Sequence, residues 1–242
     1  MYFWDTVETI PDGVGFRAFD LLHIGWLVLS LLAVIGFSVY YRRADKKGRA
    51  VWRKTIAILL VLDEVFKQVC LLIGGNWLTS YLPLHLCSIN IFVIAWHAWK
   101  PGKYTGNFLY TVCIPGAAAA LLFPSWASLP LGNFMHIHSF TVHMLLMLYP
   151  IVLTVAGDIR PDIRTIPKCL AVLIGMAVIA YFINMPLDAN FFFMAHADEG
   201  NPLGWFEQNW GNHLYGFPVL VSAIILVMHG PWLIARTIKK KA

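Results

Sequence analysis

Long apolar stretches separated by short polar connections dominate the sequence. A membrane-spanning α-helix needs about 20 mainly apolar residues, and seven stretches of the chain meet this requirement. Their approximate ranges are 19–41, 52–75, 81–99, 105–123, 133–156, 165–185 and 212–236. The pattern predicts an all-α membrane protein, a seven-transmembrane-helix bundle that forms a single integral membrane domain over residues 1–242.

The connections between these stretches alternate between basic and non-basic. Sixteen of the 18 Lys and Arg residues lie in the loop 42–54, after the third and fifth stretches, or in the C-terminal tail; Arg17 and Lys67 are the exceptions. The remaining connections contain no Lys or Arg: 75–80, 124–132 and 186–211. Because basic loops stay in the cytoplasm, we expect the N-terminus outside and the C-terminus cytoplasmic, in a multi-pass protein of the cell membrane.

The composition indicates the same class and its partners. Of the 242 residues, 59% are hydrophobic and 13% are charged, whereas a soluble domain contains about 25% charged residues. The net charge of +5 does not indicate a nucleic-acid partner, because the basic residues lie beside apolar stretches, as topology signals do. Membrane lipids are the expected partners.

The cysteines do not indicate a cofactor. All four lie inside apolar stretches and none belongs to a CxxC pair, the positions being Cys70, Cys87, Cys113 and Cys169. This spacing predicts neither a structural zinc site nor a redox motif. We therefore expect no metal and no other cofactor.

Polar side chains interrupt the apolar stretches, and nearly all of them fall in the outer half of the membrane. Such residues are costly in lipid, so they face protein or water and mark functional sites. At a rise of about 1.5 Å per residue, the topology gathers them around one cavity open to the outer leaflet. The main members are Asp20, His23, Asp63, Glu64, Lys67, His85, Cys87, Asn90, His136, Ser139, His143, His213 and Tyr215.

The second stretch carries three charges at helical spacing. Asp63 and Glu64 precede Lys67 by four and three residues, so either carboxylate can reach the ammonium group on one helical face. One interpretation is a structural salt bridge turned away from lipid. The other is that the second carboxylate orients a histidine of a neighbouring helix, as the acid of a catalytic triad does.

The fifth stretch places His136, Ser139 and His143 on one helical stripe. His138 lies about 200° around a helix from His136, so the two cannot chelate one metal on a regular helix. Three interpretations remain open for the stripe: structural histidines, acid–base work in the cavity, or a metal site that His85 completes from the third stretch.

The third stretch, 81–99, forms one wall of the expected cavity. On a helix His85 shares a face with Ser88, whereas Cys87 and Asn90 lie on another face. Cys87 is then a small buried hydrophobe, a nucleophile activated from another helix, or one half of a disulfide with Cys70, which lies at similar depth.

The connection 186–211 is rich in aromatic residues interleaved with acidic ones, namely Asp188, Phe191, Phe192, Phe193, Asp198, Glu199, Trp205, Phe206, Glu207 and Trp210. A polar outer loop does not need so many aromatic rings. The loop either folds back over the mouth of the bundle as a lid or anchors the chain at the membrane interface.

Several motifs resemble a known family. The runs 82–88 (Leu-Pro-Leu-His-Leu-Cys-Ser), 116–118 (Gly-Ala-Ala) and 134–143, together with Pro124, are similar to those of the YwaF-like bacterial integral membrane proteins, relatives of eukaryotic transmembrane protein 164. The resemblance covers most of the chain. It implies a phospholipid acyltransferase with a functional Cys and His.

Only some of the family's functional residues have counterparts in this chain. The eukaryotic Pro-Cys-His aligns with Pro83-Leu84-His85, so Leu84 occupies the position of the Cys. His85 and one of His136 or His143 match the histidines. The resemblance therefore favours histidine-assisted acyl transfer over a Cys-based acyl-enzyme.

We expect a lipid-modifying enzyme that performs acyl transfer or hydrolysis on a phospholipid at the outer cavity. His143 or His136 would be the general base, oriented by Glu64 or Asp63. Other residues complete the expected site: His85 and Asn90 position the substrate or stabilise an oxyanion, Ser139 or Cys87 acts as a covalent nucleophile, and Lys67, Asp20, His23, His213 and Tyr215 bind the substrate.

The alternative is a small-solute or proton-coupled transporter or binding protein that uses the same intramembrane polar cluster. Transport needs polar access from both sides of the membrane. The predicted inner half is poor in polar groups, and no inverted repeat is apparent, so the enzyme is the favoured prediction.

Overall fold

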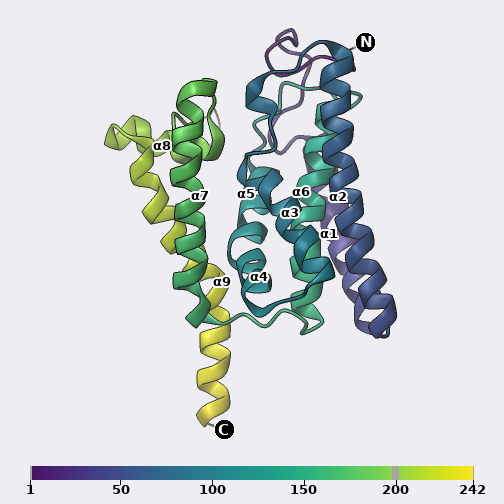
Figure 1. Ribbon diagram of the computed structural model, residues 1–242, viewed down its shortest axis with the longest axis vertical. Coiled ribbons are helices and arrows are strands. Elements are labelled where there is room, and N and C mark those ends of the chain that lie inside the picture. The colour runs from purple at the N-terminus through teal and green to yellow at the C-terminus, as the bar shows by residue number, and fades with distance from the viewer. Residues whose placement is uncertain (1, 198–201, 242) are drawn as a thin grey trace.

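The computed structural model describes residues 2–197 and 202–241, and these form helices and loops without strands (Figure 1). The nine α-helices of the described residues are α1 (Leu21–Arg43), α2 (Lys46–Gly74), α3 (Leu86–Trp99), α4 (Lys103–Phe108), α5 (Ile114–Leu122), α6 (Phe134–Val155), α7 (Ile166–Leu187), α8 (Pro202–Trp210) and α9 (Gly216–Lys241). Shorter helical turns are η1 (Thr79–Tyr81), η2 (Leu109–Cys113), η3 (Ile163–Thr165), η4 (Phe191–Phe193) and η5 (His213–Tyr215). The all-α membrane class is confirmed.

Six helical segments of the described residues are long and apolar enough to cross a membrane: Leu21–Arg43, Thr79–Trp99, Lys103–Leu122, Phe134–Val155, Ile163–Leu187 and His213–Ile234. They correspond to six of the seven predicted stretches. The other predicted stretch, 52–75, lies in α2, which is 29 residues long. Its apolar part contains Asp63, Glu64 and Lys67, and these charges separate it from the other six by composition.

The centre of the bundle is α6. It packs against α1, α2 and α5, and also contacts α3 and η2. Phe134, Phe140 and Tyr149 are fully buried on different sides of it, as expected for a helix that is apolar around most of its circumference. The stretch 81–99 is therefore one neighbour in the bundle, and α6 is the helix around which α1, α2, α3 and α5 are arranged.

Asn133 fixes the outer end of α6. Its side-chain oxygen accepts hydrogen bonds from the backbone N–H groups of Met135 (2.8 Å) and His136 (3.1 Å), which is N-cap geometry. Its amide group donates to the carbonyls of Tyr2 and Asp5, both at 2.8 Å. One side chain thus starts the central helix and ties the N-terminal segment to it.

The third helix begins later than the predicted stretch 81–99. η1 ends at Tyr81, residues 82–85 form a bend, and α3 starts at Leu86 with His85 as its N-cap. Pro83 and its restricted neighbours favour a non-helical path here. The expectation that His85 lies on one face of this helix and Cys87 on another is therefore wrong, because His85 lies outside the helix.

The fourth stretch is interrupted near its middle. Residues Leu109–Cys113 form a π-helix just before Pro115, which cannot donate a backbone hydrogen bond. The side chains of this segment hold α9: the Tyr110 hydroxyl donates to the Met228 carbonyl at 2.5 Å, and Thr111 Oγ1 lies 3.0 Å from His229 Nε2. The irregular turn is thus the attachment point of the last helix.

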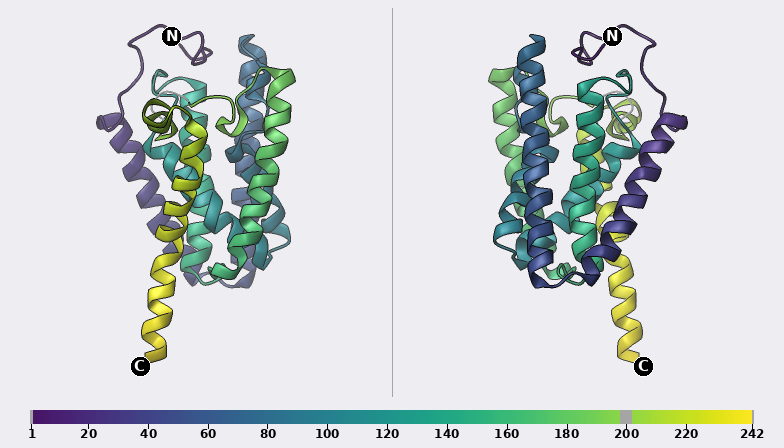
Figure 2. Two further views of the ribbon diagram at one scale, coloured as in Figure 1. Left: turned by 90° about the vertical axis from the view of Figure 1, so that its left-hand side faces the viewer. Right: turned by 90° about the vertical axis from the view of Figure 1, so that its right-hand side faces the viewer.

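The two ends of the bundle differ in charge. The N-terminal segment lies at one end and the C-terminal end of α9 extends past the other (Figures 1 and 2). At the end where α1 meets α2, Asp158 accepts hydrogen bonds from Arg49 (2.8 Å) and from the Tyr41 hydroxyl (2.7 Å). This network joins the α1–α2 corner to the loop after α6.

The N-terminal segment also crosses the α5–α6 loop closely. The Phe16 N–H donates to the Ala127 carbonyl at 2.8 Å. A Cβ atom on Gly15 would overlap the backbone of Ala127 and Ser128, so only glycine permits this approach.

Gly15→Ala is expected to lower the midpoint of thermal unfolding in detergent, because backbone must move at a cost of about 1–3 kcal/mol. Gly25→Ala is the matched control. A Cβ there meets open space on α1, and alanine in a helix favours stability by about 0.5–1 kcal/mol. Equal midpoints for the two variants would contradict the close crossing.

Candidate functional site

A buried ion pair lies on the inward face of α2. Lys67 Nζ is 2.7 Å from Glu64 Oε1, and the two residues are only 7% and 6% exposed. The Gln68 amide also donates to Glu64 Oε1, at 3.0 Å. The second carboxylate oxygen, Glu64 Oε2, is buried without a hydrogen-bond partner among the described residues. The carboxylate is thus held at one oxygen and left open at the other.

The second carboxylate of α2, Asp63, faces α6. The Thr141 hydroxyl lies 3.2 Å from Asp63 Oδ2, and it also lies within hydrogen-bond distance of the Ile137 carbonyl. His138 Nδ1 is 3.3 Å from Asp63 Oδ2, close enough for an ion pair but not aligned as a hydrogen bond. Asp63 therefore meets a histidine, and that histidine is His138.

His138 was absent from the predicted site. The sequence signal for it is that His138 and Thr141, three residues apart, share one face of the helix. Both side chains approach Asp63, so this face of α6 meets α2. Sequence reasoning treated His138 only as a poor metal partner for His136 and did not connect it to the acidic helix.

Cys87 and Asn90 lie on α3, which packs against α2. Cys87 is partly buried and packs against the main apolar core. Asn90 is buried, and its Oδ1 atom has no hydrogen-bond partner among the described residues. Cys87 and Cys70 are both free thiols, so the structure does not contain the disulfide considered from the sequence.

His143 lies one turn below Ser139 on α6. Its Nδ1 is 2.7 Å from the Ser139 carbonyl, and its ring stacks on Trp126 with a centroid distance of 5.2 Å. A carbonyl only accepts, so Nδ1 carries the proton and Nε2 presents a lone pair. His143 Nε2 forms no hydrogen bond with a described residue.

His136 has a different environment. Its Nδ1 lies 3.0 Å from the Leu129 carbonyl, and its Nε2 accepts from the Trp26 indole N–H at 3.1 Å. Both nitrogens are therefore occupied, and the ring is neutral and fully buried. The arrangement fastens α1 and the α5–α6 loop to α6.

His23 and Asp20 fasten the start of α1. The Phe19 N–H donates to His23 Nδ1, and His23 Nε2 lies 2.7 Å from the Leu121 carbonyl. Asp20 caps the helix by accepting from the backbone N–H of His23 at 2.9 Å. Backbone N–H groups of His23 and Arg17 lower the pKa of the Asp20 carboxyl. Both residues lie apart from the ion pair of α2.

A short loop covers the start of α3. Phe191 is fully buried and lies edge-on to His85, with ring centroids 4.9 Å apart. Asn184 holds the loop by two hydrogen bonds to the Phe191 backbone, at 2.9 and 3.0 Å. Phe192 and Phe193 adopt positive φ angles of 61° and 55°, a strained conformation for side chains of this size.

The rest of the connection lies further out. His213 Nε2 is 3.0 Å from the Phe193 carbonyl, and Tyr215 is exposed. Trp205 and Trp210 of α8 are also more than half exposed, which suits membrane-interface anchoring. Asp198 and Glu199 lie outside the described residues. The connection thus combines a covering part at residues 191–193 with an aromatic, outward-facing helix.

The histidines proposed for a metal site do not meet. His85 Nε2 lies 3.1 Å from the Ser80 carbonyl, whereas His136 and His143 have the separate partners described above. Across residues 2–197 and 202–241, no three His, Cys, Asp or Glu side chains are grouped to hold a metal ion.

A narrow apolar groove of about 270 Å³ runs between α2 and α3. Glu64 and Gln68 form part of its wall. The other lining residues are apolar: Val61, Val65, Val69, Leu72, Pro83, Ile91 and Phe92. Several of them are exposed on the outer surface of the bundle, so the groove opens to the side that faces lipid. Its accessible surface is apolar, and the ion pair lies behind it.

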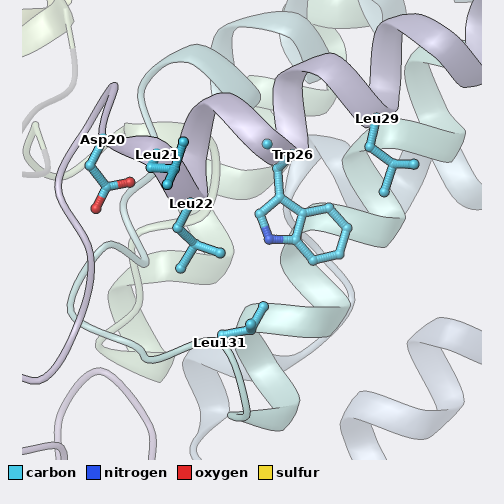
Figure 3. Close-up of a pocket in the computed structure, with 7 residues that line it drawn as sticks. Asp20, Leu21, Leu22, Trp26, Leu29 and Leu131 are labelled. Carbon is cyan, nitrogen blue, oxygen red and sulfur yellow. The ribbon is translucent and has the colours of Figure 1, made fainter.

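A larger, shallow hollow of about 700 Å³ lies on the outer surface of α1. Figure 3 shows Trp26 and Leu131 facing each other across it, with Asp20 at one end. None of the α2 charges reaches this hollow, and its walls are otherwise apolar. It is therefore a feature of the lipid-facing surface and not of the polar cluster.

The fold and these contacts define a class: a multi-pass helical membrane protein with a buried polar cluster among α2, α3 and α6. The chain belongs to the TMEM164 family, whose model matches residues 18–229. The resemblance to relatives of transmembrane protein 164 is thereby confirmed. No curated protein and no solved structure matches the chain in the comparisons made.

Lys67→Met is expected to destabilise the protein more than the double substitution Lys67→Met/Glu64→Gln. The single change leaves a buried carboxylate without its counter-charge, at a cost of about 3–5 kcal/mol, whereas the double change removes both charges. The midpoint of thermal unfolding in detergent measures the difference. The exposed Lys103–Asp162 pair supplies the control, because Lys103→Met should cost at most about 1 kcal/mol.

Asn184→Leu should release the loop over His85, because leucine has a similar size but cannot form either hydrogen bond to Phe191. Amide hydrogen exchange of residues 189–194 is then expected to accelerate relative to the parent protein. Asn209→Leu is the control, since the hydrogen bond that Asn209 forms with a described residue lies within α8. Unchanged exchange in the Asn184 variant would show that the clamp does not hold the loop.

Proposed function

We propose that this protein is a membrane lipid-modifying enzyme that carries out acyl transfer or hydrolysis on a phospholipid. The observation that carries the proposal is Glu64: its Oε2 atom is buried and unpartnered, and the residue lines a groove that opens toward lipid. Unsatisfied buried polar atoms are rare in folded proteins and call for an explanation. A phospholipid whose acyl chain lies in the apolar groove would bring its headgroup to this position. A hydroxyl or ammonium group of the headgroup, or the attacking water, would then donate to the open carboxylate oxygen, since an ester has no donor of its own.

The proposed topology has seven spans, with α2 as the additional one. Its charges are compensated inside the protein, because Glu64 pairs with Lys67 and Asp63 contacts Thr141, which is how charged residues are tolerated in a bilayer. The basic connections all lie at the end opposite the N-terminal segment. By the positive-inside rule, the N-terminus is outside and the C-terminus cytoplasmic.

In the proposed reaction a histidine on α6 removes the proton from the attacking hydroxyl or water oxygen. That oxygen adds to the ester carbonyl, and the negative charge that develops on the carbonyl oxygen is stabilised by the Lys67 ammonium. When the ester C–O bond breaks, the histidine returns the proton to the leaving alkoxide. The contact of His138 with Asp63 favours His138 as this base, and the free Nε2 of His143 makes it the second candidate.

The other residues of the predicted site have different roles in this proposal. Asn90, with its free Oδ1 atom, binds a donor group of the substrate. Cys87 and Ser139 are the candidate nucleophiles if an acyl-enzyme forms, and His85 stands at the outer entrance beneath Phe191. A structural role is assigned to the others: His136, His23, Asp20, His213 and Tyr215.

The packing below the cluster favours an enzyme over the transporter alternative. Leu60, Ile91 and Ile94 are fully buried and belong to one apolar core with Tyr149 and Val152. This layer separates the ion pair of α2 from the Asp158 network at the other end. A transport path would need polar groups through this layer.

The test is lipid turnover by purified protein in liposomes of phosphatidylethanolamine and phosphatidylglycerol that contain a fluorescent acyl-chain phospholipid. His138→Gln is expected to reduce turnover about 10²–10⁴-fold, the usual contribution of an acid–base group, and Glu64→Gln is expected to reduce turnover because it removes the carboxylate that accepts from the bound donor. Asp158→Asn, which breaks an ion pair far from the groove, should leave turnover unchanged. The products are measured by mass spectrometry.

His143→Gln is measured in the same assay. A loss confined to this variant would assign the base to His143 and not to His138. Full turnover in both histidine variants and in Glu64→Gln would contradict the proposed site. Correct folding of each variant is checked by its size-exclusion profile and its thermal midpoint.

A further inference from the structure

Three lysines at the basic end of the bundle each lie over an aromatic ring. Lys54 Nζ is 5.7 Å from the centroid of Trp99, and Lys100 Nζ is 4.8 Å from that of Trp96. Lys168 Nζ is 4.3 Å from the centroid of Tyr104. All three distances are within the range of cation–π attraction.

The three rings come from one short segment. Trp96, Trp99 and Tyr104 belong to the nine residues at which α3 ends and α4 begins, and they are 58%, 52% and 55% exposed. The lysines come from α2, from the end of α3 and from α7. We call this surface, made of Lys54, Trp96, Trp99, Lys100, Tyr104 and Lys168, the α3–α4 corner.

No described carboxylate neutralises the ammonium charges of the lysines in this corner. In the described part of the chain, the ion pairs at this end are those of Asp158 with Arg49 and Arg53, and of Asp162 with Lys103. Both carboxylates are thus taken by other cations, and none pairs with Lys54, Lys100 or Lys168. The Lys54 and Lys100 ammonium groups keep free N–H donors, because a ring face occupies only one side of each. Lys168 Nζ also donates to the Tyr104 hydroxyl at 3.2 Å and keeps its other N–H donors.

We propose that the α3–α4 corner binds the headgroup of an anionic phospholipid in the leaflet at the basic end of the bundle. Exposed tryptophan and tyrosine rings lie at the headgroup level of membranes, and the rings hold the lysine ammonium groups at that level. Lysines near a membrane surface attract anionic lipids. This binding is independent of the proposed enzymatic site, which lies in the other half of the bundle.

The experiment measures which lipid the protein retains. Purified protein is exchanged into nanodiscs of phosphatidylcholine and phosphatidylglycerol at equal amounts, and co-purified lipids are counted by native mass spectrometry after transfer to mild detergent. The parent protein is expected to retain phosphatidylglycerol in preference to phosphatidylcholine. The triple variant Lys54→Gln/Lys100→Gln/Lys168→Gln should lower this preference at least about tenfold.

Two further variants make the result specific. Arg42→Gln/Lys46→Gln/Lys47→Gln removes the same charge at the same end, from residues with no aromatic ring beneath them among the described contacts, and should retain most of the preference. Lys54→Arg/Lys100→Arg/Lys168→Arg keeps charge and ring contact and should behave as the parent. An equal loss in both glutamine variants would show diffuse surface charge and overturn the proposal. The absence of any preference in the parent would also overturn it.

Discussion

The charge balance of α2 is the constraint on which the rest of the bundle depends. Three ionised side chains near the middle of a membrane helix are tolerated only when they face protein and are compensated there. Glu64 and Lys67 compensate each other, and Asp63 is compensated by groups on α6. This requirement fixes the rotation of α2 about its own axis. It also explains why α6, which supplies Thr141 and His138, occupies the centre.

The histidines show how one residue type serves two purposes in the same fold. His136 and His23 have partners at both ring nitrogens, so each acts as a neutral tie between segments. His138 and His143 each keep a nitrogen without a hydrogen bond to a described residue, and His138 also lies 3.3 Å from Asp63 Oδ2 of α2. The two kinds of histidine differ in whether a ring nitrogen is left without a partner. A ring with both nitrogens engaged cannot accept a proton without losing a contact.

Local spacing made some of this predictable from the sequence. The pairing of Glu64 with Lys67 follows from their separation of three residues, and the apolar lengths follow from the thickness of a bilayer. The meeting of Asp63 with His138 depends on how two distant helices face each other, which periodicity does not determine. The late start of α3 was also missed, because the apolar run 81–99 conceals a bend at Pro83 that hydropathy does not register.

Several buried polar side chains near the two ends of the molecule use both of their polar atoms. At the outer end, Asn133 uses both its oxygen and its amide group, and Asn184 bonds the Phe191 backbone twice. At the basic end, Asp158 engages partners at both carboxylate oxygens. Glu64 and Asn90, on facing helices between these ends, each keep a buried oxygen without a partner. Ser38, Trp52, Arg53, Trp126 and His138 also keep one buried polar atom without a described partner. Glu64 Oε2 and Asn90 Oδ1 differ from these because, as a carboxylate and an amide oxygen, they only accept hydrogen bonds, so a bound hydrogen-bond donor is the simplest physical explanation for them.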